Sequence, residues 1–153
     1  MVAATLYGWS PVAMHGWRAT LLKLFGAKIQ GRVFVYPSTD IWAPWNLSMA
    51  DGSCLGPRVI CYSVGGISLA EHALVSQGSH LCSATHDHRD PKFPLVVGAI
   101  AIGPRAWIAA DAFVGPGVTV GERAVVGARS VVMKDVPAGI VVAGNPATPK
   151  GPR

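Results

Sequence analysis

An aliphatic residue returns every six positions between Ile100 and Met133. These positions are Ile102, Ile108, Val114, Val120, Val126 and Val132, and a small residue follows directly after five of them. A second column of small or branched residues lies four positions after each: Ala106, Ala112, Val118, Ala124 and Ser130. A period of six fits neither the face of a helix nor a long alternating strand. It predicts a short β-segment and a tight turn, repeated three times per triangular coil, with the aliphatic side chain pointing inward. Some other β-solenoid remains an alternative. We expect the small follower to turn the corner, because glycine accepts a positive φ cheaply.

The same period extends upstream with two interruptions. Val35 and Ile41 are six residues apart, and we expect the coils to begin near Val33. The steps from Ile41 to Met49 and from Cys61 to Leu69 are eight residues, which predicts two widened corners. The first contains Trp42, Pro44, Trp45 and Asn46, and the second contains Tyr62, Ser63, Val64, Gly65 and Gly66.

A polar segment interrupts the repeat between Leu81 and Ile102. We expect residues 83–99 to leave the coil as a loop, and polar loops on rigid scaffolds often carry function. Upstream, apolar residues at helical spacing predict an amphipathic helix over His15–Phe25, ended by Gly26. Residues 1–32 therefore form a leader and helix, 33–136 an all-β coil domain, and 137–153 a tail with a strand-like Ile140 to Ala143.

The composition is that of one folded domain. Of 153 residues, 50% are hydrophobic and 14% charged, and the mean hydropathy is +0.38. We attribute this apolar excess to subunit contacts, because no uninterrupted apolar run is long enough for a spanning helix. The net charge of +5 is scattered, which disfavours nucleic acid and suits a ligand with phosphates. Three cysteines, Cys54, Cys61 and Cys82, suggest buried thiols in a reducing compartment, and the amino terminus lacks signal-peptide features, so we expect a cytoplasmic protein.

Two residues stand out as functional candidates before any family is considered. His86 lies in the polar loop, and an imidazole suits a general base near neutral pH. Trp107 directly precedes the inward Ile108, so its indole points outward and covers either a ligand or another subunit.

The loop and the repeats together resemble the hexapeptide-repeat acyltransferases, and within them the sugar O-acetyltransferases of the colanic-acid type. The segments that carry the resemblance are His86-Asp87 to Asp90-Pro91, Phe93-Pro94-Leu95, Trp107-Ile108-Ala109-Ala110, Phe113 to Val118, Gly127 to Val132 and Gly144-Asn145-Pro146-Ala147. The resemblance implies a left-handed parallel β-helix and a homotrimer with active sites between subunits. It also implies direct transfer of an acetyl group from acetyl-CoA to a saccharide hydroxyl, in exopolysaccharide biosynthesis, without a metal.

The resemblance also assigns roles to residues. His86 would be the catalytic base. The acetyl-CoA groove would comprise Trp107, Ala109, Ala110, Gly127 and Ala128, with Lys134 near the phosphates. The acceptor site would comprise Tyr62, Ser63, Asp87, His88 and Asp90. The tail Thr148-Pro149-Lys150-Gly151 departs from the family pattern.

Several alternatives stay open at this stage. Cys82 could act as a covalent nucleophile, although its place beside an inward Leu81 favours a structural thiol. A zinc site of the γ-carbonic-anhydrase type would draw on His72, His80, His86 and His88. Tyr62, Trp42 and Trp45 could stack on a sugar or form a trimer interface. The remaining alternatives are a serine or antibiotic acceptor and a non-catalytic scaffold.

Overall fold

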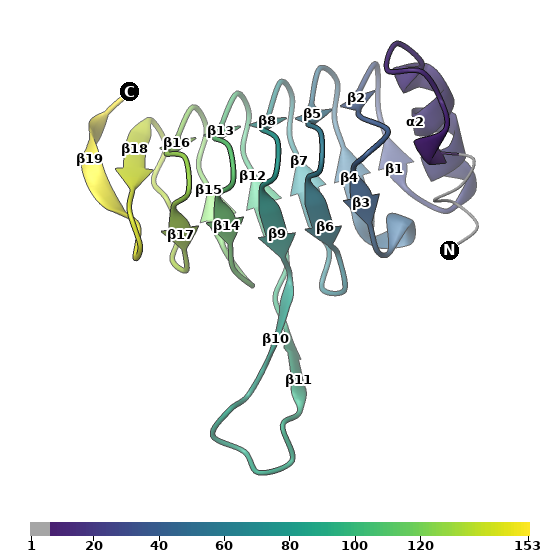
Figure 1. Ribbon diagram of the computed structural model, residues 1–153. Helices are drawn as coiled ribbons and strands as arrows, with labels where there is room; N and C mark the ends of the chain where they lie inside the picture. Colours follow the sequence, from purple (N-terminus) through teal and green to yellow (C-terminus); the bar gives the residue numbers. More distant parts are fainter. Residues whose placement is uncertain (1–6) are drawn as a thin grey trace.

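The computed structural model describes residues 7–153, which wind into a three-sided prism of parallel β-coils (Figure 1). Sheet A holds β1 (Lys28–Ile29), β4 (Leu47–Met49), β7 (Ile67–Leu69), β12 (Ile100–Ile102) and β15 (Thr119–Val120). Sheet B holds β2 (Phe34–Val35), β5 (Cys54–Leu55), β8 (Leu74–Val75), β13 (Trp107–Ile108), β16 (Val125–Val126), β18 (Ile140–Ala143) and β19 (Thr148–Pro152). Sheet C holds β3 (Asp40–Ile41), β6 (Ile60–Tyr62), β9 (His80–Cys82), β14 (Phe113–Val114) and β17 (Val131–Val132). The chain visits A, B and C in turn, as the period of six predicts.

The strand register shows where each coil gains residues. On sheet B, Phe34 pairs with Cys54 and Cys54 with Leu74, so the first two steps are each 20 residues (54 − 34 and 74 − 54). Leu74 then pairs with Trp107, a step of 33, and Trp107 with Val125, a step of 18. All the extra residues fall at the corner between sheets C and A. The 3-10 turn η1 (Pro44–Asn46) fills the first widened corner, which confirms the predicted insertion.

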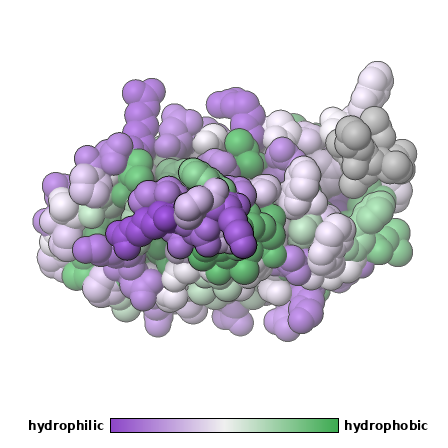
Figure 2. All heavy atoms as spheres, turned by 90° about the horizontal axis from the view of Figure 1, so that it is seen from below, coloured by the Kyte–Doolittle hydropathy of each residue, from purple (hydrophilic) through white to green (hydrophobic). Residues whose placement is uncertain are grey.

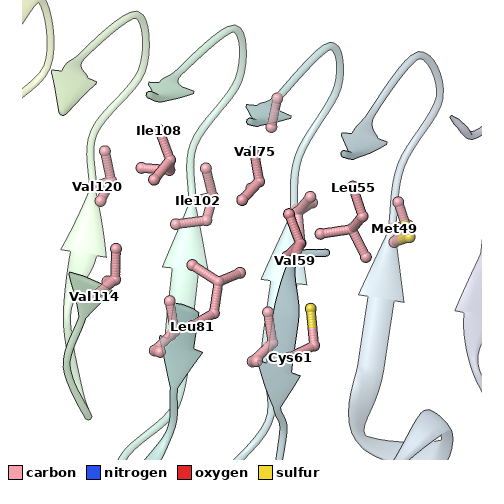
Figure 3. Close-up of a cluster of buried hydrophobic side chains, with 14 of the residues drawn as sticks. Met49, Leu55, Val59, Cys61, Val75, Leu81, Ile102, Ile108, Val114 and Val120 are labelled. Carbon is pink, nitrogen blue, oxygen red and sulfur yellow. The ribbon is translucent and has the colours of Figure 1, made fainter. Parts of the chain in front are cut away.

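The aliphatic column forms the core. Ile102, Ile108, Val114, Val120, Val126 and Val132 are at most 2% exposed, and Figure 3 shows residues of this column stacked from coil to coil. Ile41, near the start of the column, is partly buried. The second column is buried as well: Ala106, Ala112, Val118, Ala124 and Ser130. The prediction that the aliphatic residues point inward is therefore confirmed.

Contrary to the expectation from the sequence, the small residues that follow the aliphatic column do not turn the corner through a positive φ. Gly103 and Gly121 are absent from the residues with positive φ, whereas Arg105 and Arg123, two positions later, have φ of 54° and 57°. A Cβ on Gly121 would lie 2.5 Å from the backbone nitrogen of Ala138 in the next coil. The follower is small because adjacent coils approach closely at the corner.

Helix α2 (His15–Leu24) covers the first coil. It ends one residue before the predicted Phe25, and Gly26 follows with φ of 90°, as the sequence predicts. The coil begins at Lys28, which pairs with Ser48, rather than at the expected Val33. Of the predicted leader, residues 1–6 lie outside the described part of the chain. Among the described residues, no helix is long and apolar enough to cross a membrane.

The carboxyl end closes the prism. Strand β18 pairs in parallel with β16, and β19 folds back antiparallel onto β18. The strand-like Ile140 to Ala143 is therefore confirmed as a further strand on sheet B.

Candidate active site

The predicted loop is a β-hairpin that projects from the middle of the prism (Figure 1). We call residues 83–99 the arm; it contains β10 (Ala84–His86) and β11 (Leu95–Val97), which pair antiparallel with His86 opposite Leu95. Asp87 Oδ1 accepts a hydrogen bond from the Arg89 N–H at 2.9 Å, and Asp90 Oδ1 accepts one from the Lys92 N–H at 2.8 Å. Both aspartates therefore shape the turn at the tip.

The arm fixes one ring nitrogen of His86. His86 is exposed, and its Nδ1 lies 2.7 Å from the carbonyl oxygen of Phe93. A carbonyl oxygen only accepts, so this hydrogen bond requires the proton to be on Nδ1. In the neutral ring, Nε2 then carries the free lone pair, which is the state a general base needs.

Phe93 is a site residue that the sequence did not indicate. Its own N–H bonds the Asp90 carbonyl at 2.9 Å, and its φ of 48° is uncommon for a bulky residue. The group that contacts His86 is a backbone carbonyl, which any residue carries, so no side-chain pattern marks it. The carboxylates of Asp87 and Asp90 bond backbone N–H groups of the turn and not the His86 ring.

The proposed donor residues lie on sheet B and at its corner with sheet C. Trp107 on β13 is 41% exposed, as its outward position predicts, and its Nε1 donates to Ser76 Oγ at 2.9 Å. Ala109 and Ala110 form the adjacent corner. Gly127 and Ala128 occupy the same corner one coil further, 18 residues on, and Ala128 is exposed.

Two backbone N–H groups at this corner already donate hydrogen bonds to the next coil. The Ala109 N–H donates to the Val126 carbonyl at 2.9 Å, and the Gly127 N–H donates to the Val142 carbonyl at 2.8 Å. The N–H groups of these two residues are therefore not available to a ligand. The two residues would contribute to a groove only through their small size. Ser76, which bonds the indole at the same corner, was not singled out by the sequence.

His86 and the donor corner lie on different edges of the prism. The arm leaves between β9 and β12, at the corner of sheets C and A, whereas Ala109 and Ala110 precede β14 at the corner of B and C. Sheet C therefore separates them within one chain. Lys134 is exposed and follows β17, on the same edge as the arm, so it also lies apart from Ala109 and Gly127.

The predicted acceptor residues differ in access. The Tyr62 ring is half-buried and lies 5.9 Å from the Trp42 ring, which is 67% exposed, and His88 is exposed on the arm. Ser63, by contrast, is fully buried. Its Oγ donates to the Ala43 carbonyl at 3.0 Å and accepts from the Ala43 N–H at 3.2 Å. Ser63 thus holds two coils together and is not available to a sugar.

The histidines considered for zinc do not gather. His72 lies at the corner of sheets A and B, His80 packs its ring against Phe113 on sheet C, and His86 and His88 lie on the arm. Across residues 7–153, no group of three His, Cys, Asp or Glu side chains is arranged to hold a metal ion.

The three cysteines are free thiols. Cys61 is buried, and burial raises its pKa to about 12. Cys54 and Cys82 are only partly buried, contrary to the expectation, because they flank inward residues rather than occupying the core column. The Cys82 Sγ lies 3.2 Å from the Ala84 carbonyl oxygen, to which it donates.

Comparisons with known proteins agree with this geometry. The family Bacterial transferase hexapeptide (six repeats) matches residues 100–134. The chain is 47% identical over 146 residues to the putative colanic acid biosynthesis acetyltransferase WcaF of Escherichia coli, covering 95% of this chain and 80% of that protein. Among solved structures, a maltose O-acetyltransferase from Clostridium difficile matches with a TM-score of 0.88 and 20% identity, covering 98% of this chain and 82% of that one. A hexapeptide-repeat acetyltransferase from Vibrio cholerae, complexed with acetyl-CoA, matches with a TM-score of 0.86 and 22% identity, covering 98% and 82%.

The left-handed parallel β-helix is thus confirmed, and the chain belongs to the hexapeptide-repeat acyltransferases. Within that family it belongs with the acetyltransferases of the colanic-acid type, on the 47% identity that spans nearly its whole length.

Proposed function

We propose that this protein transfers an acetyl group from acetyl-CoA to a hydroxyl of a saccharide, in exopolysaccharide biosynthesis. The observation that carries the proposal is the hydrogen bond from His86 Nδ1 to the Phe93 carbonyl at 2.7 Å, because it leaves Nε2 as an exposed base. The names of the similar proteins support the donor and the acceptor class.

The reaction needs no covalent enzyme intermediate. His86 Nε2 accepts the proton of the acceptor hydroxyl while the oxygen attacks the thioester carbonyl of acetyl-CoA. The C–S bond then breaks, and the imidazolium returns its proton to the departing CoA thiolate. The carbonyl of Phe93 stabilises the imidazolium, since its bond to Nδ1–H strengthens when the ring is charged. A base of this kind contributes about 10²- to 10⁴-fold.

The active site forms between subunits of a homotrimer. His86 and the donor corner lie on separate edges of one prism, which supports a site that a neighbouring chain completes. The arm of one subunit would meet Trp107, Ala110 and Ala128 of the next. Cyclic symmetry then gives three equivalent sites.

Exposed and half-buried groups around this junction would bind the two substrates. The flat corner at Ala110 and Ala128 admits the pantetheine arm, and Lys134 would contact a CoA phosphate. Tyr62, Asp87, His88 and Asp90 remain candidates for the acceptor.

The first experiment compares the wild type with His86→Ala. We expect both to bind acetyl-CoA in a calorimetric titration, with thiol release in a saccharide screen at least about 10²-fold slower in the variant. His72→Asn is the matched control: His72 is exposed at another corner, and asparagine tolerates its φ of 56°. Full activity of His86→Ala would remove this residue from the mechanism, and absence of acetyl-CoA binding to the wild type would refute the proposed donor.

A second experiment tests the shared site. Ala110→Trp should block the donor groove, so this variant and His86→Ala should each have little activity alone. Mixing unfolded His86→Ala and Ala110→Trp chains and refolding them together should restore activity if one site uses both subunits. No recovery in mixed trimers would place the whole site in one chain.

A further inference from the structure

The amino-terminal end of the prism exposes large apolar side chains. We call Trp9, Val12, Met14, Leu24 and Phe25 the terminal patch; Trp9 is 90% exposed, Leu24 76% and Val12 53%. Figure 2 shows hydrophobic atoms at this end of the molecule, beside the grey residues. Such a concentration on a surface marks an interaction site.

Helix α2 cannot rotate to bury this patch. The face of the helix with Leu21 and Leu22 already packs on the first coil. Arg18 is fully buried on that face, and its Nε donates to the Val35 carbonyl at 2.6 Å. Its Nη1 donates to Ser10 Oγ at 2.7 Å, which also fixes the segment that carries Trp9. The terminal patch is therefore held outward by the contacts that attach the helix.

The exposed charges closest to the patch in the sequence are basic: none of the first 39 residues is Asp or Glu, and Lys23 and Lys28 are exposed on the helix and the first coil. Arg32 is also exposed, but it lies beside an acidic residue, since Asp51 Oδ1 accepts a hydrogen bond from its N–H at 2.6 Å. A second copy of this end would bring like charges together, which disfavours self-association. Apolar and aromatic side chains flanked by Lys and Arg are suited to the interface of an anionic bilayer.

We propose that the amino-terminal end docks on an anionic phospholipid surface. Trp9 and Leu24 insert among the upper acyl chains, and Lys23 and Lys28 contact lipid phosphates. This binding is independent of the transferase chemistry, because the patch and the arm come from different parts of the prism. In a cyclic trimer, three such ends face the same side, and their affinities reinforce one another.

The test is sedimentation of the full chain with vesicles. We expect binding to a mixture of phosphatidylcholine and phosphatidylglycerol, weak binding to phosphatidylcholine alone, and release by high salt. Lys23→Glu with Lys28→Glu should weaken binding by about 10-fold or more, since each basic residue contributes on the order of 1 kcal/mol and 1.4 kcal/mol is tenfold. Lys150→Glu, a single charge reversal at the opposite end, should have no effect.

The apolar part of the patch is tested separately. Trp9→Ser with Leu24→Ser should lower vesicle binding and leave the fold intact, because both side chains are exposed. Equal binding to vesicles with and without phosphatidylglycerol would overturn the proposal. An equal loss of vesicle binding in the Lys23/Lys28 and Lys150 variants would also overturn it. A change of oligomeric state in the Trp9/Leu24 variant, with vesicle binding unaltered, would assign the patch to a subunit contact instead.

Discussion

Leu55→Ala should destabilise the protein far more than the same substitution at Leu24. Leu55 is fully buried on β5, in register with Val35 and Val75 of the neighbouring coils, and Figure 3 shows it inside the prism. The substitution removes three carbon atoms, which lowers the free energy of unfolding by about 2.4 kcal/mol at roughly 0.8 kcal/mol per buried carbon. Flanking coils are hydrogen-bonded on both sides and cannot collapse into the cavity, so the total should reach about 3 to 5 kcal/mol. Leu24 is 76% exposed, and its loss should cost under about 0.5 kcal/mol.

The assay is urea unfolding followed by tryptophan fluorescence. Protein concentration has to be equal for all variants, because an oligomer gains stability from association. The difference between the two variants should appear in the transition midpoint, and an unchanged slope would show that the exposed area on unfolding is the same. Equal costs at Leu55 and Leu24 would refute the claim that stacked aliphatic residues hold the coils together.

Two further predictions concern the glycines and the pH dependence of stability. Gly121→Ala should destabilise by about 1 to 3 kcal/mol, because its Cβ would lie 2.5 Å from the Ala138 nitrogen, whereas Gly16→Ala on α2, with nothing within 4 Å, should stabilise by about 0.4 to 1 kcal/mol. Both are checked by thermal unfolding, and the same sign for both would contradict the close approach of the coils. Burial lowers the pKa of His80 from 6.5, so the unfolded chain binds the proton more readily, and the free energy of unfolding should fall as pH drops from about 6.5 toward the folded-state pKa. His80→Gln should lose this part of the pH dependence in urea titrations, and an identical profile would exclude His80 as its source.

The sequence predicted the fold because one repeat determines both the turn and the core. The coil start was misplaced although Ile29 lies six residues before Val35, within the same period. Ser63 was misassigned because an insertion of two residues does not reveal which side chain in the widened corner faces inward. Its contact with Ala43 comes from a coil 20 residues earlier, and only the stacked structure shows it.

The sequence indicated candidate side chains of the site but not the backbone groups that they contact. His86 stood out by chemistry, whereas its partner is the backbone carbonyl of Phe93, held by the turn of the arm. The sequence also did not predict that His86 and the donor corner lie apart, since their separation depends on which edge of the prism each turn occupies.

All changes in the length of the coils occur at one corner, so a segment at that corner can be replaced without changing the rest of the enzyme. Steps of 20, 33 and 18 residues coexist without disturbing the pairing on any sheet, because only the link from C to A changes length. The arm is therefore an exchangeable part: a hairpin from a relative, joined at residues 83 and 99, should bring its own acceptor preference onto an unaltered scaffold.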